Sequence, residues 1–165
     1  MVVKDIVFED FINYKKPSMF IICPKCSFKC NIEAGRDVCQ NSKISSQPDV
    51  DVSNKYIVEN YIRNDITKAI VFGGLEPFDT FNELVELIHE LRKVTNDDIV
   101  IYTGYNKDEI VGQLAMLSTY KNIVVKFGRF IPDNARTHID EVLGVELCSE
   151  NQYAERIDLY DKVKS

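Results

Sequence analysis

The clearest pattern in the sequence is the segment Lys68–Tyr102, which reads KAIVFGGLEPFDTFNELVELIHELRKVTNDDIVIY. It starts and ends with short apolar runs, at 68–72 and 98–102, that are typical of buried strands. Between them, residues 80–94 predict an amphipathic helix, because apolar side chains recur at helical spacing. Those side chains are Phe81, Leu84, Ile88 and Leu91. Strand, helix and strand in this order predict a parallel β-α-β unit with a right-handed crossover.

The same alternation extends in both directions along the chain. Further strands are predicted at 18–22, 122–127 and 142–147, and further helices at 53–64 and 106–118. We expect Ser53 to cap one helix, and Thr80 with Glu83 to form a capping box on another. The first residues, 2–14, suit either a strand or a short docking segment. The sequence therefore predicts an α/β fold built on parallel strands.

The length and net charge of the chain exclude several classes of protein. The chain has 165 residues and a net charge of −6, which suits one domain over 1–165 and is too short for a full eight-stranded barrel of about 250 residues. An acidic chain is not expected to grip nucleic acid. No apolar stretch suits a membrane span, and the charged start of the chain does not resemble a secretory signal. We therefore expect a cytoplasmic protein that binds neither nucleic acid nor membrane.

Unusual residues follow each of four predicted strands. A cysteine-rich loop, 23–42, follows the strand at 18–22. Gly73-Gly74-Leu75-Glu76-Pro77, Thr103-Gly104-Tyr105 and Gly128-Arg129-Phe130 follow the next three strands. Because the carboxyl ends of parallel strands meet at one edge of a sheet, these segments predict a single site there.

Cysteines are the most unusual feature of that edge. The chain has five, of which Cys23, Cys26, Cys30 and Cys39 are clustered and Cys148 stands alone. Clustered thiols in a reducing compartment more often bind metal or perform chemistry than form disulfides. Cys148 is expected to be a small buried hydrophobe.

Two cysteine triplets are possible, starting at Cys23 or at Cys26. A zinc site is poorly supported, because there is only one Cys-x2-Cys pair and both histidines, His89 and His138, lie far away in the sequence. Three thiolates on one loop suit an iron–sulfur cluster with one iron left open to another ligand.

The second triplet resembles the radical S-adenosylmethionine superfamily, whose usual motif is Cys-x3-Cys-x2-Cys, often followed by x-Asn. Cys26 and Cys30 supply the first pair, and Cys39-Gln40-Asn41 supplies the ending after a six-residue insertion. The resemblance implies a 4Fe-4S cluster on Cys26, Cys30 and Cys39, with Cys23 as the rival for the third position. It also implies a partial (β/α) barrel of about five or six parallel strands.

Later motifs narrow the resemblance to activating proteins of anaerobic ribonucleoside-triphosphate reductases. Gly73, Gly74 and Glu76 resemble the superfamily's Gly-Gly-Glu-Pro motif, with Leu75 inserted. Thr103, Gly104 and Tyr105 resemble a strand end of the activating proteins, as do 128–130 and, near the C-terminus, 149–152. The resemblance implies that S-adenosylmethionine binds at Gly73, Gly74, Glu76, Thr103, Gly104 and Tyr105.

By this resemblance, the chain reductively cleaves S-adenosylmethionine to a 5′-deoxyadenosyl radical, which generates a glycyl radical on an anaerobic ribonucleotide reductase. The large subunit of that reductase would be the protein substrate, and a flavodoxin- or ferredoxin-like protein the electron donor. Two alternatives stay open: a small radical enzyme acting on a small molecule, such as a 7-carboxy-7-deazaguanine synthase-like enzyme, and a non-enzymatic iron–sulfur or zinc module.

Overall fold

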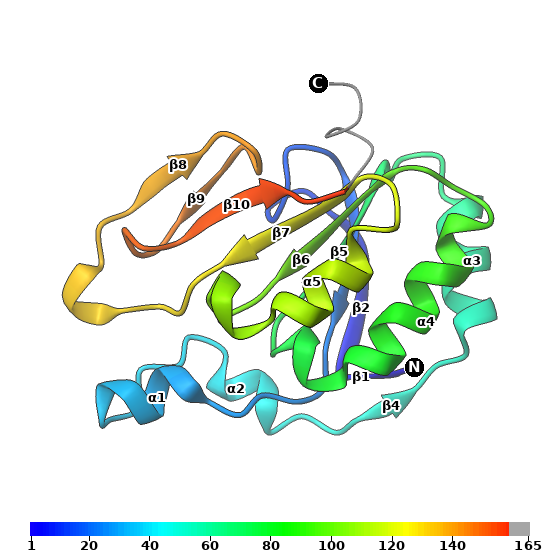
Figure 1. Cartoon of the computed structure of the whole chain (residues 1–165). Helices are drawn as coiled ribbons and strands as arrows, with labels where there is room; N and C mark the ends of the chain where they lie inside the picture. The colour runs from blue at the N-terminus through cyan, green and yellow to red at the C-terminus, as the bar shows by residue number, and fades with distance from the viewer. Residues whose placement is uncertain (159–165) are drawn as a thin grey trace.

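The centre of the protein is a six-stranded sheet, seen in a computed structural model that describes residues 1–158 (Figure 1). Its strand order is β10-β7-β6-β5-β3-β2. The strands are β2 (Asp5–Asp10), β3 (Ser18–Ile22), β5 (Ala69–Gly73), β6 (Asp98–Tyr102), β7 (Ile123–Phe127) and β10 (Tyr153–Arg156). The predicted strands at 18–22, 68–72, 98–102 and 122–127 are confirmed.

The sheet is mixed, which corrects the prediction of about five or six parallel strands. Only β3, β5, β6 and β7 run parallel, while β2 and β10 pair antiparallel at the two edges. The connection from β2 to β3, residues 11–17, is too short for the crossover that a parallel pair needs. In residues 1–158 the sheet remains open between its edge strands, so no closed barrel forms.

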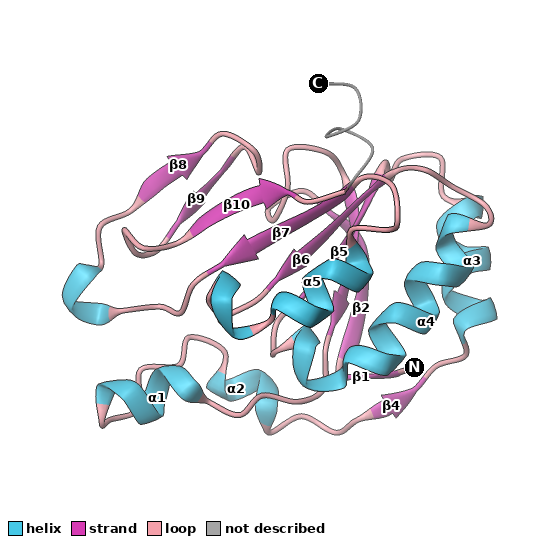
Figure 2. Ribbon diagram, in the orientation of Figure 1, coloured by secondary structure: helices cyan, strands magenta, loops and turns pink. Residues whose placement is uncertain are grey.

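Both faces of the sheet are covered, because alternate strand residues point to opposite sides. One face packs against α3 (Asn54–Arg63), α4 (Phe81–Arg92) and α5 (Val111–Leu117), which lie together in Figure 2. The opposite face is smaller, and Tyr14, Leu143 and Leu147 pack on its valines. The predicted helices at 53–64 and 80–94 are confirmed, and the one at 106–118 starts with a separate turn, η2 (Lys107–Glu109).

Shorter elements complete the described chain. The predicted cysteine-rich loop, 23–42, contains α1 (Lys29–Ala34), and it is followed by α2 (Ser42–Ser45) and β4 (Val50–Asp51). Neither helix has a buried residue. β4 pairs with β1 (Val2–Val3). A hairpin of β8 (His138–Asp140) and β9 (Val145–Leu147) precedes β10, with η3 (Pro132–Asn134) before it. None of the helices in residues 1–158 has the length and apolar character that a membrane crossing needs.

The two predicted caps differ in outcome. Ser53 caps α3, since its hydroxyl accepts a hydrogen bond from the Tyr56 amide at 3.1 Å. The capping box of Thr80 and Glu83 is wrong, because the Thr80 side chain makes no cap bond. The 3-10 turn η1 (Pro77–Thr80) leads directly into α4, and Glu83 instead accepts a hydrogen bond from the Val2 amide at 3.0 Å. The Glu83 carboxylate thus fastens the start of the chain to α4.

Candidate iron–sulfur site

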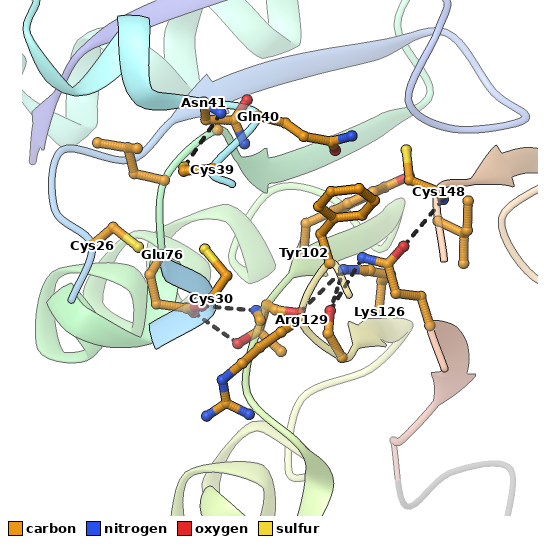
Figure 3. Close-up of a pocket in the computed structure, with 18 of the residues that line it drawn as sticks. Cys26, Cys30, Cys39, Gln40, Asn41, Glu76, Tyr102, Lys126, Arg129 and Cys148 are labelled. Atoms are coloured by element: carbon orange, nitrogen blue, oxygen red, sulfur yellow. Dashed lines mark hydrogen bonds between the residues drawn. The ribbon is translucent and has the colours of Figure 1, made fainter. Parts of the chain in front are cut away.

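A cavity of about 600 Å³ lies at the carboxyl ends of the four parallel strands. All four of the unusual segments that follow the predicted strands meet here (Figure 3). Of the predicted site residues, those that line it are Cys26, Cys30, Cys39, Gly74, Glu76, Thr103, Gly104 and Tyr105. Gly73 does not line it. The cavity is therefore the candidate functional site.

Three of the clustered cysteines face this cavity and one does not. Cys30 and Cys39 lie close enough for their thiols to interact, and Cys26 lies near Cys30. Cys23 is fully buried in the main apolar core, where burial raises the pKa of its thiol far above the ordinary value. The fold thus brings together the triplet that starts at Cys26 and turns the rival thiol inward.

Short-range hydrogen bonds shape the loop that holds the three thiols. Phe28 adopts a left-handed conformation, with φ of 52°, and its amide donates to the Cys26 sulfur at 3.3 Å. The Asn31 side-chain oxygen accepts from the amides of Val38 and Cys39 at 2.8 and 2.9 Å. Because Asn31 bridges the insertion, the residues between Cys30 and Cys39 fold back and return Cys39 to the cavity.

The base of the cysteine loop is fastened to the segment after β5. The Glu76 amide donates to the carbonyl of Lys25 at 2.8 Å, and the Ser27 amide donates to an Asp79 oxygen at 2.8 Å. The other Asp79 oxygen accepts from the Tyr105 hydroxyl at 2.6 Å. Loops from β3, β5 and β6 are therefore joined at one point beside the cavity.

The Glu76 carboxylate joins two strand ends inside the protein. One oxygen accepts from the Phe78 amide at 3.0 Å and the Thr103 hydroxyl at 2.8 Å, and the other accepts from the Gly104 amide at 2.8 Å. Burial raises the pKa of Glu76 to about 7, against the opposite effect of these three bonds. Glu76, predicted to contact the cofactor, lines the cavity and holds Thr103 and Gly104 in position through these bonds.

Tyr105 lies between two cations at the cavity wall. Lys29 stands 4.5 Å and the Arg129 guanidinium 5.9 Å from the centre of its ring, distances at which a cation is attracted to the face of an aromatic ring. Glu109 accepts two bonds from Arg129, at 2.7 and 2.8 Å, and forms an ion pair with Lys29 at 3.9 Å. The positive charge on this wall is therefore balanced by a carboxylate.

Gly73 and Gly74 lie where neighbouring side chains leave no room for a Cβ atom. This reason for glycine is separate from the S-adenosylmethionine contact that the resemblance implies. A Cβ atom on Gly73 would lie 3.1 Å from the Phe20 ring, and one on Gly74 would lie 2.5 Å from a methyl carbon of Ile22. The backbone of Gly74 also has φ of +79°, a conformation that residues with a side chain rarely adopt. β3 and the turn after β5 thus pack too closely for larger residues.

Replacing Gly74 by alanine is expected to destabilise the protein by at least about 2 kcal/mol, because it adds backbone strain to a clash. Gly112 is the matched control, since it lies exposed in α5 with no atom within 4 Å of a built Cβ. Gly112→Ala should stabilise the protein by about 0.5–1 kcal/mol. Urea denaturation of both variants measures the difference, and equal midpoints would contradict the packing argument.

The motif 149–152 clasps the loop after β7. Asn151 donates to the Arg129 carbonyl at 2.9 Å, and the Gln152 side chain donates to the Gly128 carbonyl at 3.2 Å. The Gln152 oxygen accepts from the amides of Cys148 and Ser149, both at 3.1 Å. These residues hold Arg129 and Cys148 in place at the cavity.

Cys148 and Lys126 are among the cavity residues that were not predicted from the sequence. Cys148, expected to be buried as a hydrophobe, is half-buried and lines the cavity. Lys126 is buried at the end of β7 and also lines it. The signal for Lys126 was present, because a lysine interrupts the otherwise apolar strand at 123–127. His89 and His138, the rejected zinc ligands, lie outside the cavity lining.

Among residues 1–158, no three or more His, Cys, Asp or Glu side chains are grouped as ligands of a metal ion. An iron–sulfur cluster binds cysteines as thiolates. Burial raises the pKa of Cys26 to about 11 and also raises that of Cys30. Binding the cluster would therefore release protons from these thiols.

The fold and the three cavity-facing cysteines define an iron–sulfur protein of the α/β class. Comparison with protein families agrees, since the model of the 4Fe-4S single cluster domain matches residues 18–151. The chain belongs to this family. No curated protein and no solved structure matches it. The matched range runs from β3 to the motif at 149–152 and so includes all four cavity-lining strand ends.

Proposed function

We propose that the chain is a glycyl-radical activase that acts on an anaerobic ribonucleotide reductase. The observation that carries the proposal is the cavity itself, where Cys26, Cys30 and Cys39 face Gly74 and Thr103–Tyr105 across the ends of neighbouring strands. Domains of the same family are found in activases of anaerobic reductases. The cluster would be held by the three thiols, leaving one iron open to S-adenosylmethionine.

When bound, the cluster supplies one electron that splits S-adenosylmethionine into methionine and a 5′-deoxyadenosyl radical. The electron would come from a flavodoxin- or ferredoxin-like donor. That radical would remove a hydrogen atom from a glycine Cα of the reductase, which would leave 5′-deoxyadenosine and the glycyl radical.

The chain's own residues would orient the nucleoside-bearing ligand. The backbone at Gly74 and at Thr103–Tyr105 would contact it, and Glu76 would hold the second of these segments rigid through its bonds to Thr103 and Gly104. The Gly104 amide is already bound to Glu76, so it is not available as a donor to the ligand. Tyr105, held by Asp79 and flanked by Lys29 and Arg129, would present its ring as a wall.

Anaerobic reconstitution with iron and sulfide tests the proposal. We expect a brown protein that forms 5′-deoxyadenosine from S-adenosylmethionine when dithionite is present, and none without it. Mixed with its reductase, it should produce a glycyl radical visible by electron paramagnetic resonance. A colourless product would contradict the cluster. Cleavage without any radical on the reductase would contradict the activase assignment alone.

A further inference from the structure

Lys126 lies across the cavity from the cluster loop. In Figure 3 the cysteines of that loop stand on one side, and Lys126, Tyr102 and Cys148 stand on the other. Lys126 is paired with Tyr102 in the β7–β6 register, and its amine lies 6.0 Å from the centre of the Tyr102 ring. Lys126 is only 6% exposed, so its amine is shielded from bulk solvent.

The lysine is held by neutral groups only. Its ammonium donates to the carbonyls of Gly128 at 2.8 Å and Thr103 at 3.4 Å, and an ammonium has a third donor. Within residues 1–158 Lys126 takes part in no ion pair, in contrast to Lys29 and Arg129, the other cavity cations.

Neighbouring acids do not neutralise this charge by contact. The nearby acidic groups are Glu76 and the Cys148 thiol, and both oxygens of Glu76 already accept bonds from other donors. Burial lowers the pKa of Lys126 to about 8, so the side chain still carries its charge at neutral pH. A buried cation with a spare donor beside an open cavity is a site that an anion would stabilise.

We propose that Lys126 binds a carboxylate of the substrate that enters the cavity. A single cation with one spare donor matches a monoanion, whereas a phosphate would need more donors than the Lys126 end provides. The inference rests on the proposed function, by which the carboxylate of S-adenosylmethionine belongs at the open iron on the cysteine side. The carboxylate at Lys126 would then belong to the molecule attacked, either an acidic side chain of a protein loop or a free carboxylic acid.

Nuclear magnetic resonance of the reconstituted protein with 13C-labelled lysine side chains tests the proposal, with Lys126→Met identifying the signal. We expect sodium acetate to raise the pKa of Lys126, because a carboxylate stabilises its charged form, whereas acetamide in sodium chloride of equal ionic strength should not. The peptide acetyl-Gly-Asp-Gly-amide should act likewise and its Asn counterpart should not. Lys126→Met should weaken binding of the Asp peptide at least about tenfold.

Lys107→Met is the matched control, since Lys107 is exposed and pairs with Glu155 on the surface. It should bind the Asp peptide as the unchanged protein does. A stronger response to the Asp peptide than to acetate indicates a protein loop, and equal responses indicate a free acid.

Two results would overturn the proposal. One is a pKa of Lys126 that changes neither with acetate nor with the Asp peptide. The other is a rise in its pKa with S-adenosylmethionine alone that decarboxylated S-adenosylmethionine does not cause. Failure of 5′-deoxyadenosine formation would instead count against the proposed function, because the titration does not depend on cleavage.

Discussion

Cys39→Ala should abolish the iron–sulfur cluster, whereas Cys23→Ala should keep it. Cys39 faces the cavity beside Cys30, and Asn31 holds its backbone there. Cys23 is buried among the apolar side chains of the core and does not line that cavity. Because a cluster with only two thiolates is poorly held, the Cys39 variant should contain almost no iron after reconstitution.

Iron analysis and visible absorbance of both variants measure this difference, and thermal melting shows whether each is folded. Cys23→Ala should melt at a lower temperature, since it leaves a small cavity in the core, yet hold as much iron as the unchanged protein. If iron were lost from the Cys23 variant and kept in the Cys39 variant, the assignment of the third ligand would be wrong.

Glu76→Ala should be among the most destabilising single changes at the site. It removes the acceptor of three hydrogen bonds and leaves Phe78, Thr103 and Gly104 with donors unsatisfied inside the protein. We expect a loss of about 3 kcal/mol in the free energy of unfolding. By the proposed function, binding of S-adenosylmethionine should weaken as well, because Thr103 and Gly104 lose their support.

Glu76→Gln separates the charge from the hydrogen bonds. In the folded protein the pKa of Glu76 is raised from 4.5 to about 7, so the folded state holds its proton more tightly than the unfolded state does. This contribution to stability is complete below pH 4.5 and is lost as the pH rises through 7, a change of roughly 3 kcal/mol. Glutamine does not ionise, so the Gln variant should lack this fall.

Chemical denaturation at a series of pH values measures the effect. Glu86→Gln is the matched control, because Glu86 is an exposed carboxylate on α4, and it should reproduce the pH profile of the unchanged protein. A Glu76→Gln profile identical to that of Glu86→Gln would show that the buried carboxylate does not control the pH dependence.

The parallel core of the fold was predictable because its signals are local. The apolar runs of β5 and β6 and the helical spacing in α4 appear directly in the sequence. The antiparallel edges were not predictable in the same way, because β10 reads as a short polar segment and reaches its place through pairing with β7. The capping box failed for a tertiary reason, since Glu83 is taken by the start of the chain.

The location of the site was predictable from the sequence, whereas the contacts of its individual side chains were not. The rule that sites gather at the carboxyl ends of parallel strands placed Cys26, Gly74 and Thr103 together. The inward turn of Cys23 depends on core packing, and the bonds that Glu76 forms depend on the spacing of two strand ends. Neither is encoded in a motif. Lys126 could be recognised as the one charged residue in an apolar strand. A binding role for it can be inferred only from the cavity that it lines.

The helices α1 and α2 bury no side chain. This arrangement bears on whether the chain folds before or after it receives its cluster. The hydrophobic core is complete without the segment 28–46, whose ties to the rest are a few polar contacts and the fastening at Lys25 and Ser27. The polypeptide should therefore fold before it receives iron, and chelation should loosen this segment while the sheet survives. We therefore expect the cluster to be inserted into an already folded chain.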